Sequence, residues 1–207
     1  MDIANPQGSS CTVTKRNGFS EVLPTHPAFR YDSLCVERLK QIGPGNKGAT
    51  AFHRLAELIL RMAFRDVLDR WATEEEVNEG RGRIDLRARN KAESGFFDRA
   101  RDHFEIPCPY VSIECKNYKE DVGNNEFNQL ASRLNDKTGQ LGILVCRKIS
   151  NPSAALQRAK DRLGKNQNHH ILVITDEDLI KLCETSGEGD IAAIDDLMEE
   201  KLKALIS

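Results

Sequence analysis

The segment Tyr110–Lys116 carries two side chains whose types and spacing suit metal and proton-transfer chemistry. Apolar and polar residues alternate along it, the pattern of a strand whose successive side chains point to opposite faces. Glu114 and Lys116 therefore share one face of the expected strand with Ser112, while the apolar residues pack into the core from the other face. A carboxylate and an ammonium group thus point into the same space from a rigid element.

Asp85 supplies a second carboxylate, from an expected strand over residues 84–89. If the two strands pair, Asp85 and Glu114 converge, although the 29 positions between them exceed what a tight hairpin needs. Two carboxylates at one point form a site for a hard cation such as Mg²⁺ or Mn²⁺. A cation there polarises a phosphoryl oxygen and lowers the pKa of a bound water. Lys116 would orient that water and balance the charge of the transition state.

Two helical residues are further candidates. Glu57 lies in an apolar stretch, where a carboxylate is costly without a partner or a metal. Gln129 belongs to the helix expected after the strand, and its amide would hold Lys116 or a phosphate. Each has an ordinary alternative: Glu57 can form a helix-face ion pair with Arg61 at i+4, and Gln129 can be a plain surface or capping amide. For Glu114 and Lys116 the alternative is a solvated pair on an edge strand.

Basic residues flank the expected strands and predict contacts with nucleic-acid phosphates. Arg81 and Arg83 precede Asp85, and Arg147 and Lys148 follow the expected strand 141–146. Such contacts give salt-sensitive binding that does not depend on base sequence. The alternative is a solvated basic surface. Asp85 can likewise form an ordinary surface ion pair with Arg83 or Arg87.

Together these residues resemble the PD-(D/E)xK phosphodiesterase superfamily, the restriction-endonuclease-like proteins. Four stretches are most similar to its Mrr-like branch: Gly-Arg-Ile-Asp at 82–85, Glu-Cys-Lys-Asn-Tyr at 114–118, Asn-Gln-Leu at 128–130 and Gly-Ile-Leu-Val-Cys-Arg at 142–147. The resemblance covers roughly residues 48–175. The first motif reads Arg-Ile-Asp, so the proline of the family name is absent.

This resemblance implies an α/β fold with a restriction-endonuclease-like α-β-β-β-α-β core, in which helices flank a mixed central sheet. It also implies divalent-metal-dependent hydrolysis of nucleic acid, with DNA as the first expectation and RNA as a weaker one. Asp85, Glu114 and the Cys115 carbonyl would ligate Mg²⁺ or Mn²⁺, and Lys116 would serve the water. Glu57 matches a helix acidic position that is often linked to the metal, and Gln129 matches a helix glutamine found in several branches.

Two functions therefore follow from the sequence. The first is a nuclease, for which a role in restriction or anti-phage defence rests on the resemblance alone. A homodimer is plausible because one active site cuts one strand, and a partner protein of a defence system is a further expectation. The second is a non-catalytic nucleic-acid-binding or assembly module on the same fold. The near-neutral net charge and the absence of a separate DNA-reading domain favour this alternative.

The expected elements form one nuclease-like domain over residues 47–207, preceded by an arm or a small helical lead-in over 1–46. Residues 90–109 are expected to form a hairpin or excursion at the sheet edge. Alternating strands and helices in the second half predict a partly parallel sheet. We expect helices at 32–42, 49–71, 124–135, 152–163, 176–183 and 191–206, and strands at 84–89, 110–118, 141–146 and 170–174.

Composition excludes several classes of protein. The 207 residues are 39% hydrophobic and 30% charged, which permits a packed core, and the net charge of −2 excludes a basic coat or tail. No apolar run approaches the roughly 20 residues that cross a bilayer, and residues 1–8 lack the features of a secretory signal. The six cysteines are too scattered for a zinc site or a disulfide framework. We therefore expect a cytoplasmic protein with reduced thiols.

Overall fold

A five-stranded mixed sheet forms the centre of the protein. The structure is a computed structural model that describes residues 31–77, 82–164 and 168–207, without the side chains of residues 31, 74–77 and 82–85. The strands lie in the order of the chain: β1 (Leu68–Val77), β2 (Gly82–Asn90), β3 (Tyr110–Lys116), β4 (Leu141–Cys146) and β5 (His170–Ile174). The chain is therefore an α/β protein with an open sheet.

The sheet is antiparallel at one side and parallel at the other. Strand β1 pairs with β2 and β2 with β3 in antiparallel fashion, whereas β3, β4 and β5 run parallel. The parallel strands need crossover connections, which the chain supplies as helices. The carboxyl ends of β3, β4 and β5 consequently meet at one edge of the sheet.

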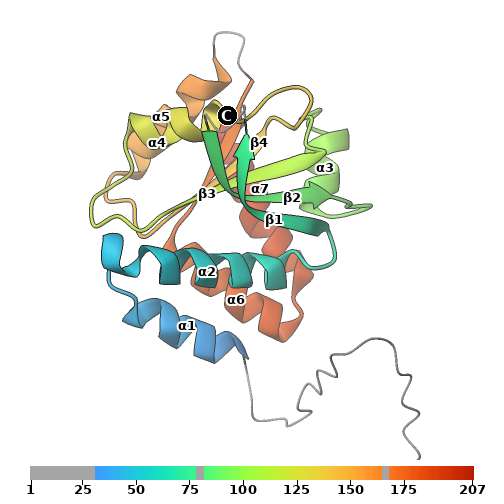
Figure 1. Cartoon of the computed structure of the whole chain (residues 1–207). Coiled ribbons are helices and arrows are strands. Elements are labelled where there is room, and N and C mark those ends of the chain that lie inside the picture. The colour runs from blue at the N-terminus through green and yellow to red at the C-terminus, as the bar shows by residue number, and fades with distance from the viewer. Residues whose placement is uncertain (1–30, 78–81, 165–167) are drawn as a thin grey trace, which may run out of the picture.

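Seven helices among the described residues surround this sheet (Figure 1). Helix α4, between β3 and β4, lies on one side of β3, and helix α2 lies on the other. Helices α1 and α6 pack beside α2, while α5 and α7 contact β5. The bounds are α1 (Tyr31–Gln41), α2 (Asn46–Ala63), α3 (Phe96–Asp102), α4 (Asn124–Ala131), α5 (Pro152–Leu163), α6 (Asp176–Glu188) and α7 (Ile191–Ile206).

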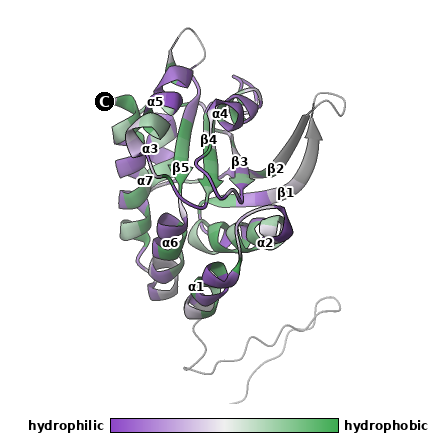
Figure 2. Ribbon diagram, turned by 90° about the vertical axis from the view of Figure 1, so that its left-hand side faces the viewer, coloured by the Kyte–Doolittle hydropathy of each residue, from purple (hydrophilic) through white to green (hydrophobic). Residues whose placement is uncertain are grey.

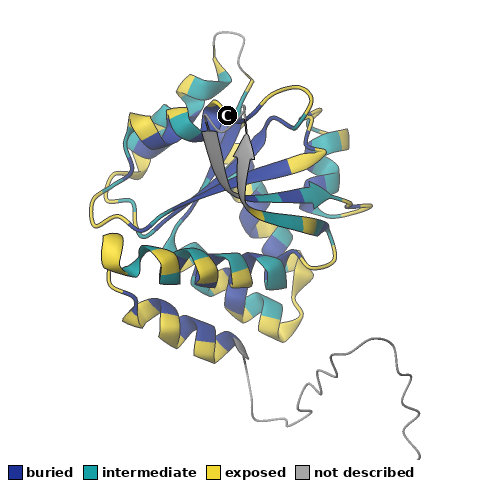
Figure 3. Ribbon diagram, viewed as in Figure 1, coloured by how far each residue is buried: buried dark blue, intermediate teal, exposed yellow. Residues whose placement is uncertain are grey.

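One continuous hydrophobic core fills the space between the sheet and the helices. Strands β4 and β5 are largely apolar (Figure 2), and all six residues of β4 are buried. Continuous apolar runs are typical of strands covered on both faces. Helix α2 contributes one buried stripe at helical spacing and leaves its other side exposed (Figure 3). The core therefore holds β3, between β2 and β4, in a fixed position.

The first long helix ends earlier than its apolar pattern predicts. Helix α2 stops at Ala63, and the chain turns through Arg65 and Asp66 into β1, where a helix was expected as far as residue 71. The sequence there has no glycine or proline to mark the end. Strand β1 forms because it pairs with β2, a contact between distant residues that the local pattern does not encode.

Residues 90–109 contain a helix instead of the expected hairpin. Phe96 and Phe97 of α3 are fully buried, and their rings pack edge to face at 5.0 Å between centroids. The α3 helix starts at Gly95, with φ of 79°, and the Asp195 carboxylate of α7 accepts a hydrogen bond from the Phe96 amide at 2.9 Å. A partner 99 residues away thus caps this helix, so no local signal announces it.

Most remaining elements agree with the sequence, but α4 ends at Ala131 instead of residue 135, β3 ends at Lys116 instead of residue 118, and α6 continues to Glu188 instead of ending at residue 183. The expected helix over 32–42 is α1, and its buried residues join the same hydrophobic core as the rest of the molecule. Residues 1–30 of the expected arm lie outside the described part of the chain. The five cysteines that the structure describes are buried, as expected for small core residues. No described helix has the length and apolarity needed to span a bilayer.

Candidate functional site

Strand β3 carries the predicted Glu114 and Lys116 side chains, and both of its faces are covered. The side chains of β3 alternate between two faces, as predicted. Ser112 pairs with Gly142 of β4, which lies against Leu130 of α4, so Ser112 and Glu114 face α4. Cys115 faces α2 on the other side. The polar face is buried, however, because α4 lies over it: Ser112 is 2% exposed and Glu114 1% (Figure 3). Glu114 and Lys116 are therefore not a solvated edge pair.

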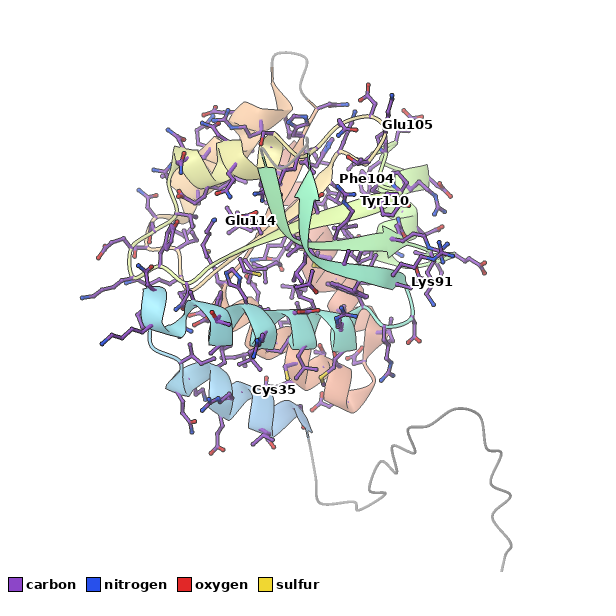
Figure 4. The ribbon with its side chains drawn as sticks, in the orientation of Figure 1. Cys35, Lys91, Phe104, Glu105, Tyr110 and Glu114 are labelled. Atoms are coloured by element: carbon purple, nitrogen blue, oxygen red, sulfur yellow. The ribbon has the colours of Figure 1, made fainter. Side chains whose placement is uncertain are left out.

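Glu114 lies in a buried ionic network under α4 (Figure 4). The Lys116 ammonium donates to Glu114 Oε1 at 2.7 Å and to Gln129 Oε1 at 3.1 Å. The Arg133 guanidinium pairs with Glu114 Oε2 from the turn after α4. The Lys116 and Arg133 side chains are only 14% and 5% exposed. A single carboxylate is thus held between two cations, and Gln129 fixes the lysine.

Charge balance governs this network. Burial makes each charge costly unless it is paired and hydrogen-bonded. The Glu114 carboxylate meets this condition, because each of its two oxygens has a cationic partner. The Lys116 ammonium has two acceptors, one on Glu114 and one on Gln129.

Asp85 belongs to β2, the strand that pairs directly with β3. The antiparallel register joins Leu86 to Ile113 and Arg87 to Ser112. Asp85 precedes Leu86 in β2, and Glu114 follows Ile113 in β3, so the two residues continue this register on adjacent strands. The predicted pairing of the strands is therefore present despite α3 in the connection between them. The Asp85 side chain itself lies outside the described part of the structure.

Helix α2 places His53 and Glu57 on the opposite side of β3 from Glu114. The His53 ring donates from Nε2 to the carbonyl of Cys115 at 2.8 Å, since a carbonyl can only accept. Glu57 pairs with Arg61 at 2.7 Å and accepts a hydrogen bond from Thr73 at 3.2 Å. The structure therefore does not bring Glu57 to Glu114, and the helix-face ion pair considered for Glu57 is present.

A cleft of about 510 Å³ opens beside this part of α2. It is bounded by side chains of α2, by Thr73 of β1, by Leu86 of β2 and by Cys115 of β3. The carbonyl of Cys115, a predicted metal ligand, accepts one hydrogen bond from His53 and has a second lone pair. The cleft thus approaches the backbone of β3 from the side that Glu114 does not face.

Two of the four predicted basic contacts are described, and they differ in kind. Arg147 is largely buried: its Nε donates to Asp176 Oδ2 at 2.9 Å, and the guanidinium lies 5.1 Å from the centre of the Phe52 ring. Lys148 is exposed. Arg147 therefore ties β4 to α2 and α6. Arg81 lies outside the described residues, as does the side chain of Arg83.

The donor atoms near β3 are of the type that a hard cation prefers. The Glu114 carboxylate and the Cys115 carbonyl offer oxygen atoms, and the residue at position 85 is an aspartate, which also has oxygen donors. Within the described side chains, no three His, Cys, Asp or Glu residues gather closely enough to hold a metal ion. A cation at Glu114 would have to take the place of Lys116 or Arg133 at one carboxylate oxygen.

Sequence reasoning missed two residues of the site. Arg133 follows α4 and reaches Glu114 across the interior, and His53 reaches the Cys115 carbonyl from 62 positions away. A basic residue between the buried Ala131 and Leu134 is the single local hint for Arg133. Neither contact follows from spacing along the chain, since both depend on how the helices pack onto β3.

Comparison with known proteins gives a weak relationship to a transposon protein. The chain is 30% identical over 139 residues to the putative transposon gamma-delta 80.3 kDa protein of Escherichia coli (strain K12). The matched part is 66% of this chain but 19% of that protein, so the chain spans about a fifth of its relative's length. No family model and no solved structure matches the chain.

Proposed function

We propose that the protein is a divalent-metal-dependent nuclease that hydrolyses phosphodiester bonds, with DNA as its substrate. The observation that carries the proposal is the buried Glu114–Lys116 pair, held by Gln129, on the strand that pairs with the Asp85 strand. A carboxylate and a lysine fixed side by side next to a second acidic position are the groups that metal-assisted hydrolysis needs.

The order of the elements supports the same proposal. Helix α2 is followed by three antiparallel strands, by helix α4 and by the parallel strand β4. This is the α-β-β-β-α-β order expected for a restriction-endonuclease-like core, with α3 inserted before β3.

Each group has a distinct task in the proposed reaction. Asp85, Glu114 and the Cys115 carbonyl would hold Mg²⁺ or Mn²⁺, which supplies polarisation of a phosphoryl oxygen and a more acidic water. Lys116 would orient the water and offset the charge that develops on the phosphate. Gln129 would position Lys116 once Glu114 turns to the cation. Glu57 is left out of the proposed metal site because it faces the other side of β3.

The relative's name favours DNA over RNA. The Escherichia coli protein is named as a putative transposon protein, and a transposon is a DNA element. A role in restriction or anti-phage defence, as a homodimer or with a partner protein, extends the proposal and rests on the family resemblance.

A plasmid assay tests the proposal. Supercoiled DNA should be nicked or cut in Mg²⁺ or Mn²⁺ and left intact in EDTA. Asp85→Asn and Lys116→Ala should abolish cleavage, whereas the matched surface variants Asp66→Asn and Lys137→Ala should cut like the parent protein. Cleavage that survives in Asp85→Asn or in EDTA would show that these residues do not form a nuclease site.

One observation favours the alternative of a non-catalytic nucleic-acid-binding or assembly module. The Glu114 carboxylate is already engaged by Lys116 and Arg133, an arrangement that also serves as a buried structural network. In that case no divalent metal would produce cleavage, and Asp85→Asn would leave DNA binding unchanged. The plasmid assay combined with a binding measurement therefore separates the two functions.

A further inference from the structure

A small basic pocket lies at the carboxyl ends of the three parallel strands. It has a volume of about 300 Å³. Tyr118 and Lys119 follow β3, Arg147 and Lys148 follow β4, and Asp176 begins α6 directly after β5, while Pro44 precedes α2. Crevices at the carboxyl ends of parallel strands are where ligands of α/β proteins bind. No residue of the proposed metal site lines this pocket.

The charges of the pocket favour an anion. Three cationic side chains line it, against the one carboxylate of Asp176. That carboxylate is paired with Arg147 at 2.9 Å. Asp121, which is near Lys148, accepts hydrogen bonds from the Ser150 and Asn151 amides. Asp121 and one oxygen of Asp176 are therefore engaged within the protein, and the two exposed lysines, Lys119 and Lys148, face solvent.

Arg147 forms part of the wall of this pocket and is held there by the protein. Its Nε and Nη2 donate to Asp176 and to the Leu39 carbonyl, and its guanidinium lies 5.1 Å from the centre of the Phe52 ring. The second oxygen of Asp176 and the Nη1 of Arg147 are both buried in this ion pair. The exposed lysines are therefore the cations that a ligand can reach directly.

Helix α6 and the Tyr118 ring border the same pocket. The helix runs for 13 residues from Asp176, and its N-terminal end meets the pocket. Three carboxylates in its first turn, those of Asp176, Glu177 and Asp178, offset the positive end of the helix dipole, so the lysines supply the attraction for an anion. The exposed Tyr118 ring, 40% accessible, offers a stacking surface at the rim. A phosphate with an adjoining base matches this combination of cations and an aromatic ring.

We propose that this pocket binds one phosphate of a single nucleic-acid strand, with Lys119 and Lys148 on the phosphate and Tyr118 against the neighbouring base. The inference rests on the proposed function for its choice of ligand. Lys119 is three residues after Lys116, a span of at most roughly 11 Å. The strand would therefore be held next to the proposed reaction site, by a phosphate other than the one that is cleaved.

Binding in EDTA tests the pocket without cleavage. A fluorescein-labelled single-stranded DNA is titrated with the full chain at several salt concentrations, and anisotropy gives the affinity. The double variant K119A/K148A should flatten the slope of log affinity against log salt by at least about 0.7, the value for one phosphate on a single strand. Tyr118→Ala should weaken binding without changing that slope, and Tyr118→Phe should restore it.

Two exposed lysines at the other end of the sheet provide the control. Lys91, which Figure 4 labels, follows β2, and Lys137 precedes β4. The double variant K91A/K137A should keep the parent's slope. The proposal that the pocket binds phosphate is wrong if K119A/K148A keeps the parent's salt slope, or if K91A/K137A lowers that slope by the same amount. A nucleoside monophosphate and an oligonucleotide of equal charge are then compared as competitors of the labelled DNA. If the monophosphate displaces the DNA at the lower concentration, a nucleic-acid strand is not the ligand of the pocket.

The outcomes of this test and of the plasmid assay are separable. A lost salt slope in K119A/K148A without any metal-dependent cleavage would support the phosphate pocket and reject the nuclease. Cleavage that depends on Asp85, combined with an unchanged slope, would do the reverse. Because Lys119 and Lys148 are exposed, their replacement should leave the melting temperature within the range of ordinary surface variants.

Discussion

The buried carboxylate of Glu114 provides the sharpest test of the physical account of β3. Glu114→Gln keeps the shape of the side chain but removes the negative charge between Lys116 and Arg133. Two nearly buried cations then lose the carboxylate that lies between them. Removal of one partner from a buried ion pair costs about 3–5 kcal/mol, a large part of a typical domain's stability.

Urea unfolding in EDTA measures this cost. With a slope of about 2 kcal/mol per molar urea, the loss lowers the midpoint by roughly 1.5–2.5 M. Glu93→Gln, at an exposed glutamate, is the matched control and should shift the free energy of unfolding by no more than about 0.5 kcal/mol. A midpoint for Glu114→Gln within about 0.5 M of the parent would refute the buried network.

A double-mutant cycle then assigns the cost to the Arg133 contact. Arg133→Met removes one cation and leaves Glu114 paired with Lys116 alone. Once Glu114 is already glutamine, the same change removes an unpaired charge, and it should cost less or even stabilise. The two effects should therefore differ by at least about 1 kcal/mol, since groups in one network couple. Additive effects would mean that Arg133 and Glu114 do not interact.

Two further perturbations test other parts of the fold. Gly139→Ala should lower the free energy of unfolding by more than about 1 kcal/mol. The φ angle of Gly139 is 126°, and a Cβ atom there would lie 2.4 Å from the Tyr110 carbonyl oxygen. Gly123→Ala is the control and should be tolerated, because the nearest atom to its Cβ would be 3.6 Å away. Burial raises the pKa of Asp176 to about 6, although Arg147 opposes the shift. As the pH rises, Asp176 therefore loses its proton at a lower pH in the unfolded chain than in the folded protein. The free energy of unfolding consequently decreases as the pH rises from about 4 to about 6. Asp176→Asn should reduce that fall in urea titrations; an unchanged pH profile would contradict the shift.

Local pattern carried most of the fold. Helix α7 and strand β4 begin and end where their periodicity predicts, and Asn151 and Pro152 mark the start of α5 by a cap and a proline at the first turn. These signals survive because they arise within a few residues. The end of α2 and the start of β1 carry no such signal, and the α3 cap comes from Asp195 at the other end of the chain.

The candidate site also combines features that local sequence determines with features that depend on tertiary packing. Alternation along β3 was enough to put Glu114 and Lys116 on one face, because the side-chain period of a strand is a local property. The depth at which they lie depends on α4 covering that face, and the Arg133 and His53 contacts depend on helix packing across 19 and 62 positions. Residue types and spacing thus determine which groups are available, whereas burial and the choice of partners emerge only when distant segments pack, since desolvation and pairing are properties of the assembled core.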